Sequence, residues 1–278
     1  MQCISTHRSF DGVTSFYSHH SRVCNTTMRF SVYEPPQAIE RACPVLFYLA
    51  GLTCTEETFM MKAGAQRWAA KHGLMLVAAD TSPRGLNLPS KADAWDFGVG
   101  AGFYVDATVA PWSANFQMYS YITQELPEIV AANCGGDVTR QGIFGHSMGG
   151  HGALVCALRN PGQYRSLSAL APIVAPMQCP WGRKAFAGYL GDDEKSWRAY
   201  DATELIKKTQ LAFPILIDQG LRDKFLAEQL KPQLFNNACE AVGQSLIYRS
   251  HAEYDHGYYF VATFMEDHIE HHARLLNA

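Results

Sequence analysis

The sequence lacks the clusters and runs that mark several large classes of protein. Only 18% of its 278 residues are charged, the formal net charge is -3, and no cluster of lysine and arginine occurs along the chain. A nucleic-acid partner would require a positive face that displaces counterions, so we expect no such partner. No apolar run approaches the roughly eighteen residues that cross a bilayer, so we expect no membrane partner either.

Cysteine pairs with the spacing of metal ligands are also missing. The eight cysteines are scattered and none form a Cys-x-x-Cys motif, which argues against a zinc site. The first residues have no uninterrupted apolar stretch after their charge, so we expect no signal peptide, a cytoplasmic location and reduced thiols. The chain also has no internal repeat and no low-complexity linker, and 47% of it is hydrophobic. We therefore expect residues 1–278 to form a single globular domain of enzyme size.

Short apolar runs alternate with longer helical stretches, which is typical of a mostly parallel sheet with helices on both faces. Buried strands are expected at 45–49, 74–79, 142–144, 166–170, 214–217 and 245–248, with an antiparallel edge strand at 30–33. Helices are expected at 57–71, 115–132, 149–159 and 259–276. The long span 172–213 is expected to form an irregular insertion over the carboxyl edge of the sheet, where such an architecture binds its ligand.

One of the expected strands leads into a Gly-x-Ser-x-Gly motif. Ser147 lies between Gly145 and Gly149, after the strand at 142–144 and before the helix at 149–159. Such a turn is so tight that side chains in place of the flanking glycines would clash with neighbouring elements. The serine hydroxyl then lies at a helix N-terminus, whose partial positive charge favours an oxyanion. The motif in this context predicts an α/β-hydrolase fold with Ser147 as nucleophile.

A serine hydroxyl is a weak nucleophile until a base takes its proton, so one of the eleven histidines should supply that base. His256 fits best, because it lies in a loop after the last strand and before the last helix, as the fold requires. His251 is its rival but is expected to belong to the strand end. His146 adjoins the serine on a sharp turn, where neighbouring side chains point apart.

Three further histidines are grouped near the end of the chain. His268, His271 and His272 have the i, i+3, i+4 spacing of a metal-binding helix face. A partly solvated helix end, where imidazoles suit the dipole, is the favoured interpretation. No metal site is therefore predicted.

The acid that orients the histidine should follow the strand at 214–217. Asp218, at the strand end, and Asp223, in the loop beyond it, both qualify. The acid must reach a histidine on another loop, which favours Asp223 because it lies in the loop itself. The spacing alone does not decide between Asp218 and Asp223. Whichever residue is not the acid is expected to cap the turn.

The oxyanion that forms on attack needs two main-chain donors. One is the amide of Met148, directly after the nucleophile, and the other should come from the loop after the strand at 45–49. Leu52 is the candidate in that loop. Cys54, two residues further on, is expected near the site without a catalytic role. Trp181 in the insertion is expected either to wall the acyl pocket or to serve packing alone.

Several longer stretches resemble the S-formylglutathione hydrolase family, also called esterase D. The matching stretches run in order along nearly the whole chain: 49–57, 80–85, 100–108, 145–153, 179–186, 218–220 with 223–226, and 254–260. The resemblance implies a cytosolic thioesterase that splits S-formylglutathione into formate and glutathione, the closing step of glutathione-dependent formaldehyde detoxification. It implies no cofactor, and it makes a homodimer plausible.

Carried over position by position, the resemblance makes Ser147 the nucleophile, His256 the base and Asp223 the acid, with the oxyanion amides at Leu52 and Met148. It thereby favours Asp223 over Asp218. In the matched stretches, Arg84, Arg183 and Lys184 are candidates for binding the charged groups of glutathione, or are surface charges.

Other functions remain open at this stage. A broad-specificity carboxylesterase or an acyltransferase would use the same three residues. A catalytically inactive hydrolase fold, used as a binding module, would usually lack one of them.

Overall fold

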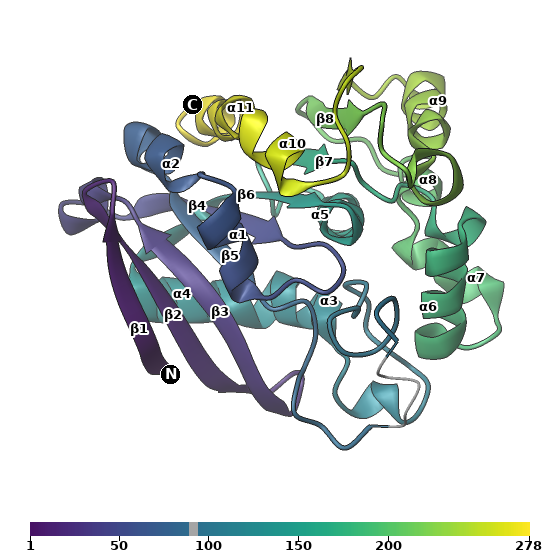
Figure 1. Ribbon diagram of the computed structural model, residues 1–278, viewed down its shortest axis with the longest axis horizontal. Coiled ribbons are helices and arrows are strands. Elements are labelled where there is room, and N and C mark those ends of the chain that lie inside the picture. The colour runs from purple at the N-terminus through teal and green to yellow at the C-terminus, as the bar shows by residue number, and fades with distance from the viewer. Residues whose placement is uncertain (89–93) are drawn as a thin grey trace.

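The computed structural model describes residues 1–88 and 94–278, and a nine-stranded sheet runs through the centre of this part of the chain (Figure 1). Its order is β1-β2-β3-β5-β4-β6-β7-β8-β9. The strands β1 to β3 and the β3–β5 pair are antiparallel, and β5 to β9 are parallel. The strands are β1 (Gln2–Ser9), β2 (Gly12–Ser21), β3 (Thr26–Glu34), β4 (Cys43–Leu49), β5 (Met75–Ala79), β6 (Gly136–His146), β7 (Ser166–Leu170), β8 (Ile215–Gly220) and β9 (Leu246–His251).

The antiparallel strand expected at 30–33 exists as part of β3, but its expected position at the sheet edge is wrong. β3 pairs with β2 on one side and β5 on the other, and β1 forms the edge. The side chains of β1 are mostly exposed and form no apolar run, so this strand gave no hydrophobic signal in the sequence. By contrast, all residues of β4 and β5 are buried, as expected of strands covered on both faces.

Most of the helices lie between successive parallel strands. They are α1 (Glu56–Lys62), α2 (Gln66–His72), α3 (Met118–Ser120), α4 (Leu126–Cys134), α5 (Met148–Arg159), α6 (Pro180–Leu190), α7 (Glu194–Trp197), α8 (Ala202–Leu205), α9 (Pro232–Val242), α10 (Tyr258–Thr263) and α11 (Met265–Leu276).

Three of the expected helices are interrupted. The one expected at 57–71 breaks at Gly64, which has φ +65°, and the one expected at 259–276 breaks at Phe264. The one expected at 115–132 becomes α3, a π-helical turn at Tyr121–Glu125 and α4. Pro127 has no N–H to donate to Thr123, whose carbonyl instead accepts a hydrogen bond from Gln163 (2.8 Å). Apolar periodicity continues through all three breaks, which is why the sequence did not reveal them.

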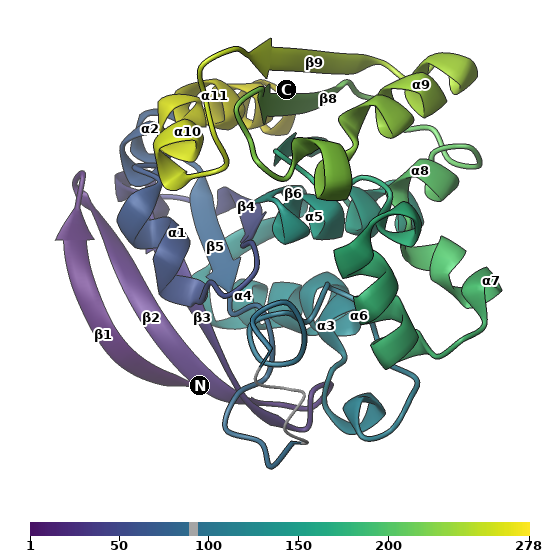
Figure 2. The same ribbon diagram turned by 45° about the vertical axis from the view of Figure 1, so that its right-hand side comes forward.

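The helices form a layer on each face of the sheet (Figures 1 and 2). α2 and α11 contact each other, and α11 lies against β6 and β7. α5 packs on β4, β6 and β7 from the opposite side, together with α4 against β6. The segment 172–213 carries α6, α7 and α8, which lie to one side of the sheet beyond α5. The carboxyl ends of β4, β6, β8 and β9 meet at one edge, so the four loops that carry the expected site residues begin close together.

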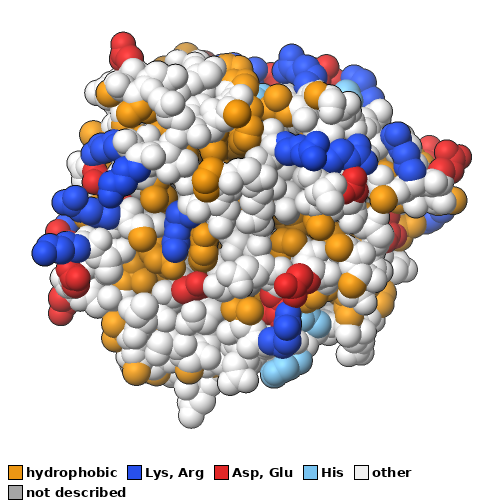
Figure 3. Space-filling view, turned by 180° about the vertical axis from the view of Figure 1, so that it is seen from behind, with side chains coloured by type: hydrophobic (Ala, Val, Ile, Leu, Met, Phe, Trp, Pro, Cys, Tyr) orange, Lys and Arg blue, Asp and Glu red, His pale blue; other side chains and the backbone are white. Residues whose placement is uncertain are grey.

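The surface carries charges of both signs in small groups separated by uncharged areas, as the face in Figure 3 shows. Within residues 1–88 and 94–278, no helix is long and apolar enough to cross a membrane.

Candidate active site

Ser147 occupies a strained turn between β6 and α5. Its backbone has φ 58° and ψ -118°, a conformation that side-chain-bearing residues rarely adopt and that neighbouring contacts must stabilise. The amide of Ser147 donates to the carbonyl of Leu170 (3.0 Å). A Cβ atom at Gly149 would lie 1.9 Å from the carbonyl oxygen of Leu49, and one at Gly145 would lie 2.2 Å from the carbonyl oxygen of Gly149. Both glycines are therefore required for the close approach of β4, β6 and α5.

The structure brings together the three side chains that the sequence assigned to catalysis. The hydroxyl of Ser147 lies 2.9 Å from Nε2 of His256, and Nδ1 of His256 lies 2.5 Å from Oδ2 of Asp223. An ionised carboxylate only accepts, so the Nδ1–H donates to Asp223 and leaves Nε2 to accept the Ser147 proton. Asp223 also accepts from the amide of Phe225 (2.8 Å), which fixes the carboxylate.

Asp218, the alternative acid, serves a different purpose. It lies within β8 and is fully buried, and it accepts two hydrogen bonds from Arg249 (2.6 and 2.5 Å) and one from His268 (3.1 Å). Burial alone would raise the pKa of Asp218, but the bonds from Arg249 and His268 outweigh burial and hold the pKa well below its usual range. The expectation that Asp218 caps a turn is wrong, because β8 continues through it to Gly220.

The rival histidines also have other contacts. His251 ends β9, as expected, with Nε2 3.3 Å from Asp218 and its ring stacked on Phe264. His146 lies against His256, with ring centroids 4.6 Å apart. Burial, and then the neighbouring His256, lower the pKa of His146 well below its usual value, so its ring stays neutral.

The expectation of a solvated helix end for His268, His271 and His272 is wrong. All three are buried, and α11 turns them towards β7. His268 and His272 both lie within hydrogen-bond distance of Ser168 (2.7 and 2.8 Å), and His271 Nε2 lies 3.2 Å from the carbonyl oxygen of Leu167. In the part of the chain that the structure describes, no group of three or more His, Cys, Asp or Glu residues is arranged to hold a metal ion.

A cavity of about 130 Å³ opens at Ser147 and His256. Leu52, Cys54 and Trp181, the other residues expected near the site, all line it. Sequence reasoning missed Trp95, Phe225 and Tyr258, which line it too; the last two are each two residues from a triad candidate. A larger and more open hollow of about 480 Å³, beside Leu221 and Tyr248, touches none of the triad candidates.

Trp181 stands between two aromatic neighbours at the cavity wall. Its ring lies 5.3 Å from that of Trp95 and 4.7 Å from that of Phe225, and the residue is 7% exposed. Cys54 is only partly buried, and this burial raises the pKa of its thiol.

The loop after β4 brings the backbone of Leu52 close to the serine. A Cβ atom at Gly51 would lie 3.3 Å from Cβ of Ser147, so the two turns are in direct contact. The two amides that follow Leu52 are engaged: Thr53 donates to the carbonyl of Gly100 (2.8 Å) and Cys54 to that of Gly51 (3.3 Å). Met148 is the first residue of α5, and amides in the first turn of a helix have no partner within the helix.

The basic residues considered for glutathione are paired with carboxylates. Arg84 is bonded to Asp80, Arg183 lies 2.6 Å from Glu194, and Lys184 lies 2.5 Å from Asp96. The structure therefore gives each of the three a partner within the chain.

A mostly parallel sheet with a serine at a strained strand–helix turn, and a histidine and an aspartate in hydrogen-bond sequence behind it, is the architecture of an α/β-hydrolase. The family model described as a putative esterase matches residues 21–271. The chain is 55% identical to the S-formylglutathione hydrolase of Mus musculus (99% of this chain, 98% of the relative) and 52% identical to that of Arabidopsis thaliana (98% and 97%). An S-formylglutathione hydrolase structure from Agrobacterium tumefaciens matches with a TM-score of 0.97 at 47% identity, over 99% of this chain and 100% of that one.

The chain belongs to the S-formylglutathione hydrolase family of esterases. The resemblance found in the sequence is thereby confirmed, and so is the α/β-hydrolase fold.

Proposed function

We propose that this protein hydrolyses S-formylglutathione to formate and glutathione, with Ser147 as nucleophile, His256 as base and Asp223 as the acid that orients it. The observation that carries the proposal is the series of hydrogen bonds Ser147–His256–Asp223, of which Ser147 and His256 line a small cavity. The protein is about half identical to S-formylglutathione hydrolases. The pathway that the family resemblance implies is formaldehyde detoxification.

The first half of the reaction forms a formyl-enzyme. Ser147 attacks the thioester carbonyl while His256 Nε2 takes its proton, and Asp223 stabilises the resulting imidazolium. The negative charge that develops on the carbonyl oxygen is held by the amides of Leu52 and Met148. The C–S bond then breaks, and glutathione leaves as a thiolate that takes the proton from His256.

The second half regenerates the serine. Water attacks the formyl ester with His256 again as base, and formate leaves as the Ser147 oxygen recovers its proton. Every proton in both steps is carried by His256, so the chemistry requires no cofactor.

The size of the cavity favours a small acyl group. A formyl group has a single carbon, and the cavity of about 130 Å³ is bounded by Trp181 and Tyr258, so it suits short acyl groups better than long ones. A carboxylesterase that accepts long acyl chains, the second candidate, would need these walls to move.

The proposal is tested by comparing kcat/KM for S-formylglutathione, S-acetylglutathione and p-nitrophenyl butyrate. We expect the formyl thioester to be preferred by about a hundredfold or more, because each added carbon must fit against the cavity wall. Equal turnover of the three would favour the carboxylesterase. A fluorophosphonate probe should label the protein but not Ser147→Ala, and labelling that persists would exclude Ser147 as the nucleophile.

The resemblance also implies a cytoplasmic location and makes a homodimer plausible, and both stay predictions. Light scattering coupled to size exclusion measures the mass in solution, against 30.9 kDa for one chain.

A further inference from the structure

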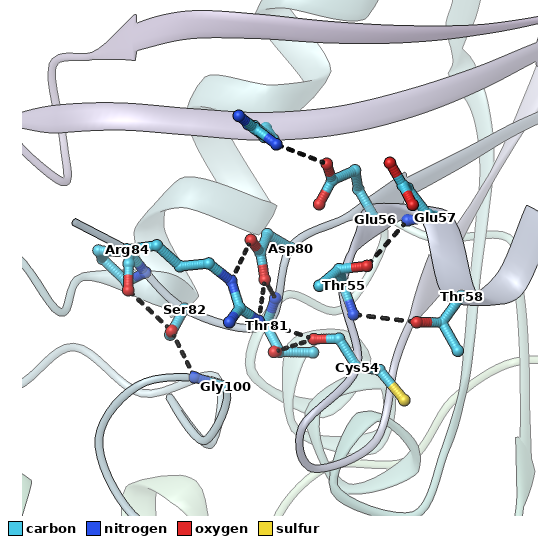
Figure 4. A network of polar contacts seen from close by, with 12 residues as sticks. Cys54, Thr55, Glu56, Glu57, Thr58, Asp80, Thr81, Ser82, Arg84 and Gly100 are labelled. Carbon is cyan, nitrogen blue, oxygen red and sulfur yellow. Dashed lines mark hydrogen bonds and ion pairs between the residues drawn. The ribbon is translucent and has the colours of Figure 1, made fainter. Parts of the chain in front are cut away.

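The loop of residues 50–55, called here the oxyanion loop, is held in place by side chains from a neighbouring segment. Figure 4 shows the segment after β5, with Asp80, Thr81 and Arg84, lying directly against Cys54. The carbonyl oxygen of Cys54 accepts hydrogen bonds from the hydroxyl of Thr81 (2.6 Å) and from Nη2 of Arg84 (3.1 Å). Asp80, Thr81 and Arg84 do not line the cavity at Ser147.

The position of Cys54 in turn controls the direction of the Leu52 amide. The Cys54 N–H donates to the carbonyl of Gly51 (3.3 Å), which fixes the plane of the Gly51–Leu52 peptide. In a planar trans peptide the N–H points opposite to the C=O. Holding the Gly51 carbonyl towards Cys54 therefore aims the Leu52 N–H away from it. Thr53, between them, has φ +68°, a conformation that the surrounding contacts must maintain.

Arg84 is itself held rigidly. Its Nε and Nη2 donate to the two carboxylate oxygens of Asp80 (2.7 and 2.9 Å), a bidentate pair with planar geometry. The side chain of Asp80 is 4% exposed and that of Arg84 is 37% exposed. The same Nη2 also bonds the Cys54 carbonyl, so the rigid Asp80–Arg84 pair limits the movement of the oxyanion loop.

A second brace leads from the same segment to the loop. The Ser82 hydroxyl accepts from the amide of Gly100 (2.7 Å), and the carbonyl of Gly100 accepts from the amide of Thr53 (2.8 Å). Residues 80–84 thus reach the oxyanion loop at Cys54 directly and at Thr53 through Gly100. Figure 4 shows the bond between Ser82 and Gly100.

We infer that Arg84, together with Asp80 and Thr81, is a positioning residue that aims the Leu52 N–H at the oxyanion formed when Ser147 attacks a carbonyl. This inference rests on the proposed function only in that Ser147 attacks a carbonyl; it does not depend on glutathione. It differs from the other assignment open to Arg84, that of a ligand for a carboxylate of glutathione.

The test uses Arg84→Met, which keeps an unbranched apolar stem of similar length and removes every donor. Kinetics are measured with S-formylglutathione and with p-nitrophenyl acetate, which has no glutathione moiety. We expect kcat to fall about tenfold for both substrates with KM nearly unchanged. Complete loss of an oxyanion donor costs about a hundred- to a thousandfold, and here the donor is only misdirected.

Thr81 supplies an independent variant of nearly the same shape. Thr81→Val removes the hydroxyl that bonds Cys54, and we expect a fall in kcat of about threefold for both substrates. Thr81→Ser keeps the hydroxyl, so its kcat should stay near that of the unsubstituted protein. The profile of kcat/KM against pH should drop in height without moving along the pH axis in either Arg84→Met or Thr81→Val, because the Asp223–His256 pair is untouched.

The chain contains a matched control in Arg140. Its Nε donates to Asp137 (2.7 Å) and its Nη2 to the carbonyl of Ala42 (3.4 Å), the same combination of carboxylate and carbonyl away from the cavity. Arg140→Met should leave kcat unchanged. Thermal unfolding of all variants identifies any that fail to fold, in which case Thr81→Val carries the test.

Two results would overturn the inference. A rise in KM confined to S-formylglutathione would make Arg84 a ligand of glutathione. Unchanged kcat in both Arg84→Met and Thr81→Val would show that the oxyanion loop keeps its position without these hydrogen bonds. If the wild type turned over p-nitrophenyl acetate but not S-formylglutathione, the proposed substrate would fail, while the effect of these variants on the ester would still decide the inference.

Discussion

Two Asp–His–Ser chains of hydrogen bonds lie in the described part of the molecule, one at the cavity and one in the core. In the first, Asp223 and Ser147 flank His256. In the second, called here the core chain, Asp218 lies 3.1 Å from Nε2 of His268, whose Nδ1 lies 2.7 Å from the hydroxyl of Ser168. The residue types are the same and the distances are similar.

The surroundings of the two serines differ. Ser147 lines a cavity at the first turn of α5, where a substrate carbonyl can approach and helix amides can hold its charge. Ser168 is fully buried in the middle of β7, and its hydroxyl also lies 2.8 Å from Nε2 of His272. The proton and one lone pair of Ser168 are therefore already engaged by the two imidazoles.

The carboxylates differ as well. Both carboxylate oxygens of Asp218 accept hydrogen bonds from Arg249, and one of them, Oδ2, also faces His268, so the charge of Asp218 is balanced by the arginine. Asp223 accepts from the amide of Phe225 and from Gln219 (3.3 Å), neither of which is charged, so its charge is available to His256. The comparison shows that access and electrostatic surroundings, rather than residue identity, separate a candidate catalytic triad from a structural one.

Removing the two serine hydroxyls should give the largest difference. We expect Ser147→Ala to lower kcat by about ten-thousandfold or more, because the nucleophile is lost. Ser168→Ala should keep kcat within about threefold but destabilise the fold by about 1–3 kcal/mol, since two buried imidazoles lose a partner. Steady-state kinetics and urea unfolding measure the two effects. A loss of activity in Ser168→Ala without loss of stability would contradict the structural role of the core chain.

Replacing each carboxylate by an amide should again distinguish the candidate catalytic from the structural Asp–His–Ser chain. Asp223→Asn should lower kcat by about ten-thousandfold with little change in stability, because the amide stabilises the wrong tautomer of His256. Asp218→Asn should mainly destabilise the fold, by about 2–4 kcal/mol, since it leaves His268 without a charged partner and Arg249 with Asp267 alone. Equal and mild effects of both variants on kcat would refute the assignment of the acid.

Enlarging the cavity should change specificity by a smaller factor. Trp181→Ala removes one wall, so we expect the ratio of kcat/KM for p-nitrophenyl butyrate to that for p-nitrophenyl acetate to rise about tenfold. Trp197→Ala provides the control, since Trp197 lies in the same segment 172–213 but packs against Phe186. If both variants changed the ratio alike, Trp181 would have only a packing role.

The smallest expected effect concerns acid stability. Burial lowers the pKa of His272 well below its usual value, so the folded state excludes a proton that the unfolded state binds below about pH 6.5. The free energy of unfolding should therefore fall as pH drops from about 6.5, by at most about 1.4 kcal/mol per pH unit from this residue. His272→Gln should make this slope shallower, and an unchanged slope in urea titrations from pH 7 to pH 5 would contradict the argument.

Asp218 acts in a separate and more acidic range. Its pKa is depressed in the folded state, so its contribution to stability is fully present above about pH 4 and is lost as pH falls further. Of these two residues, only His272 contributes within the range from pH 7 to pH 5.

Much of the site could be predicted from local patterns. The Gly145–Gly149 motif required a particular turn, and the order of elements along the chain selected His256 over His251. The choice between Asp218 and Asp223 stayed open in the spacing, because five residues of sequence do not reveal where β8 ends. The helix breaks at Gly64 and Phe264 and the edge position of β1 were also hidden, since they depend on pairing and packing between distant segments.

The sequence by itself determined the class of fold, the candidate nucleophile and the family, because each is encoded in short segments whose backbone geometry is dictated locally. Only the tertiary structure decided which Asp–His pair faces a cavity, that three C-terminal histidines are buried beneath β7, and that Arg84 braces the oxyanion loop. The physical reason is that these roles depend on burial, charge pairing and distances between residues far apart in the chain. Asp218 and His268, for example, are separated by 50 positions and meet only when α11 packs on the sheet.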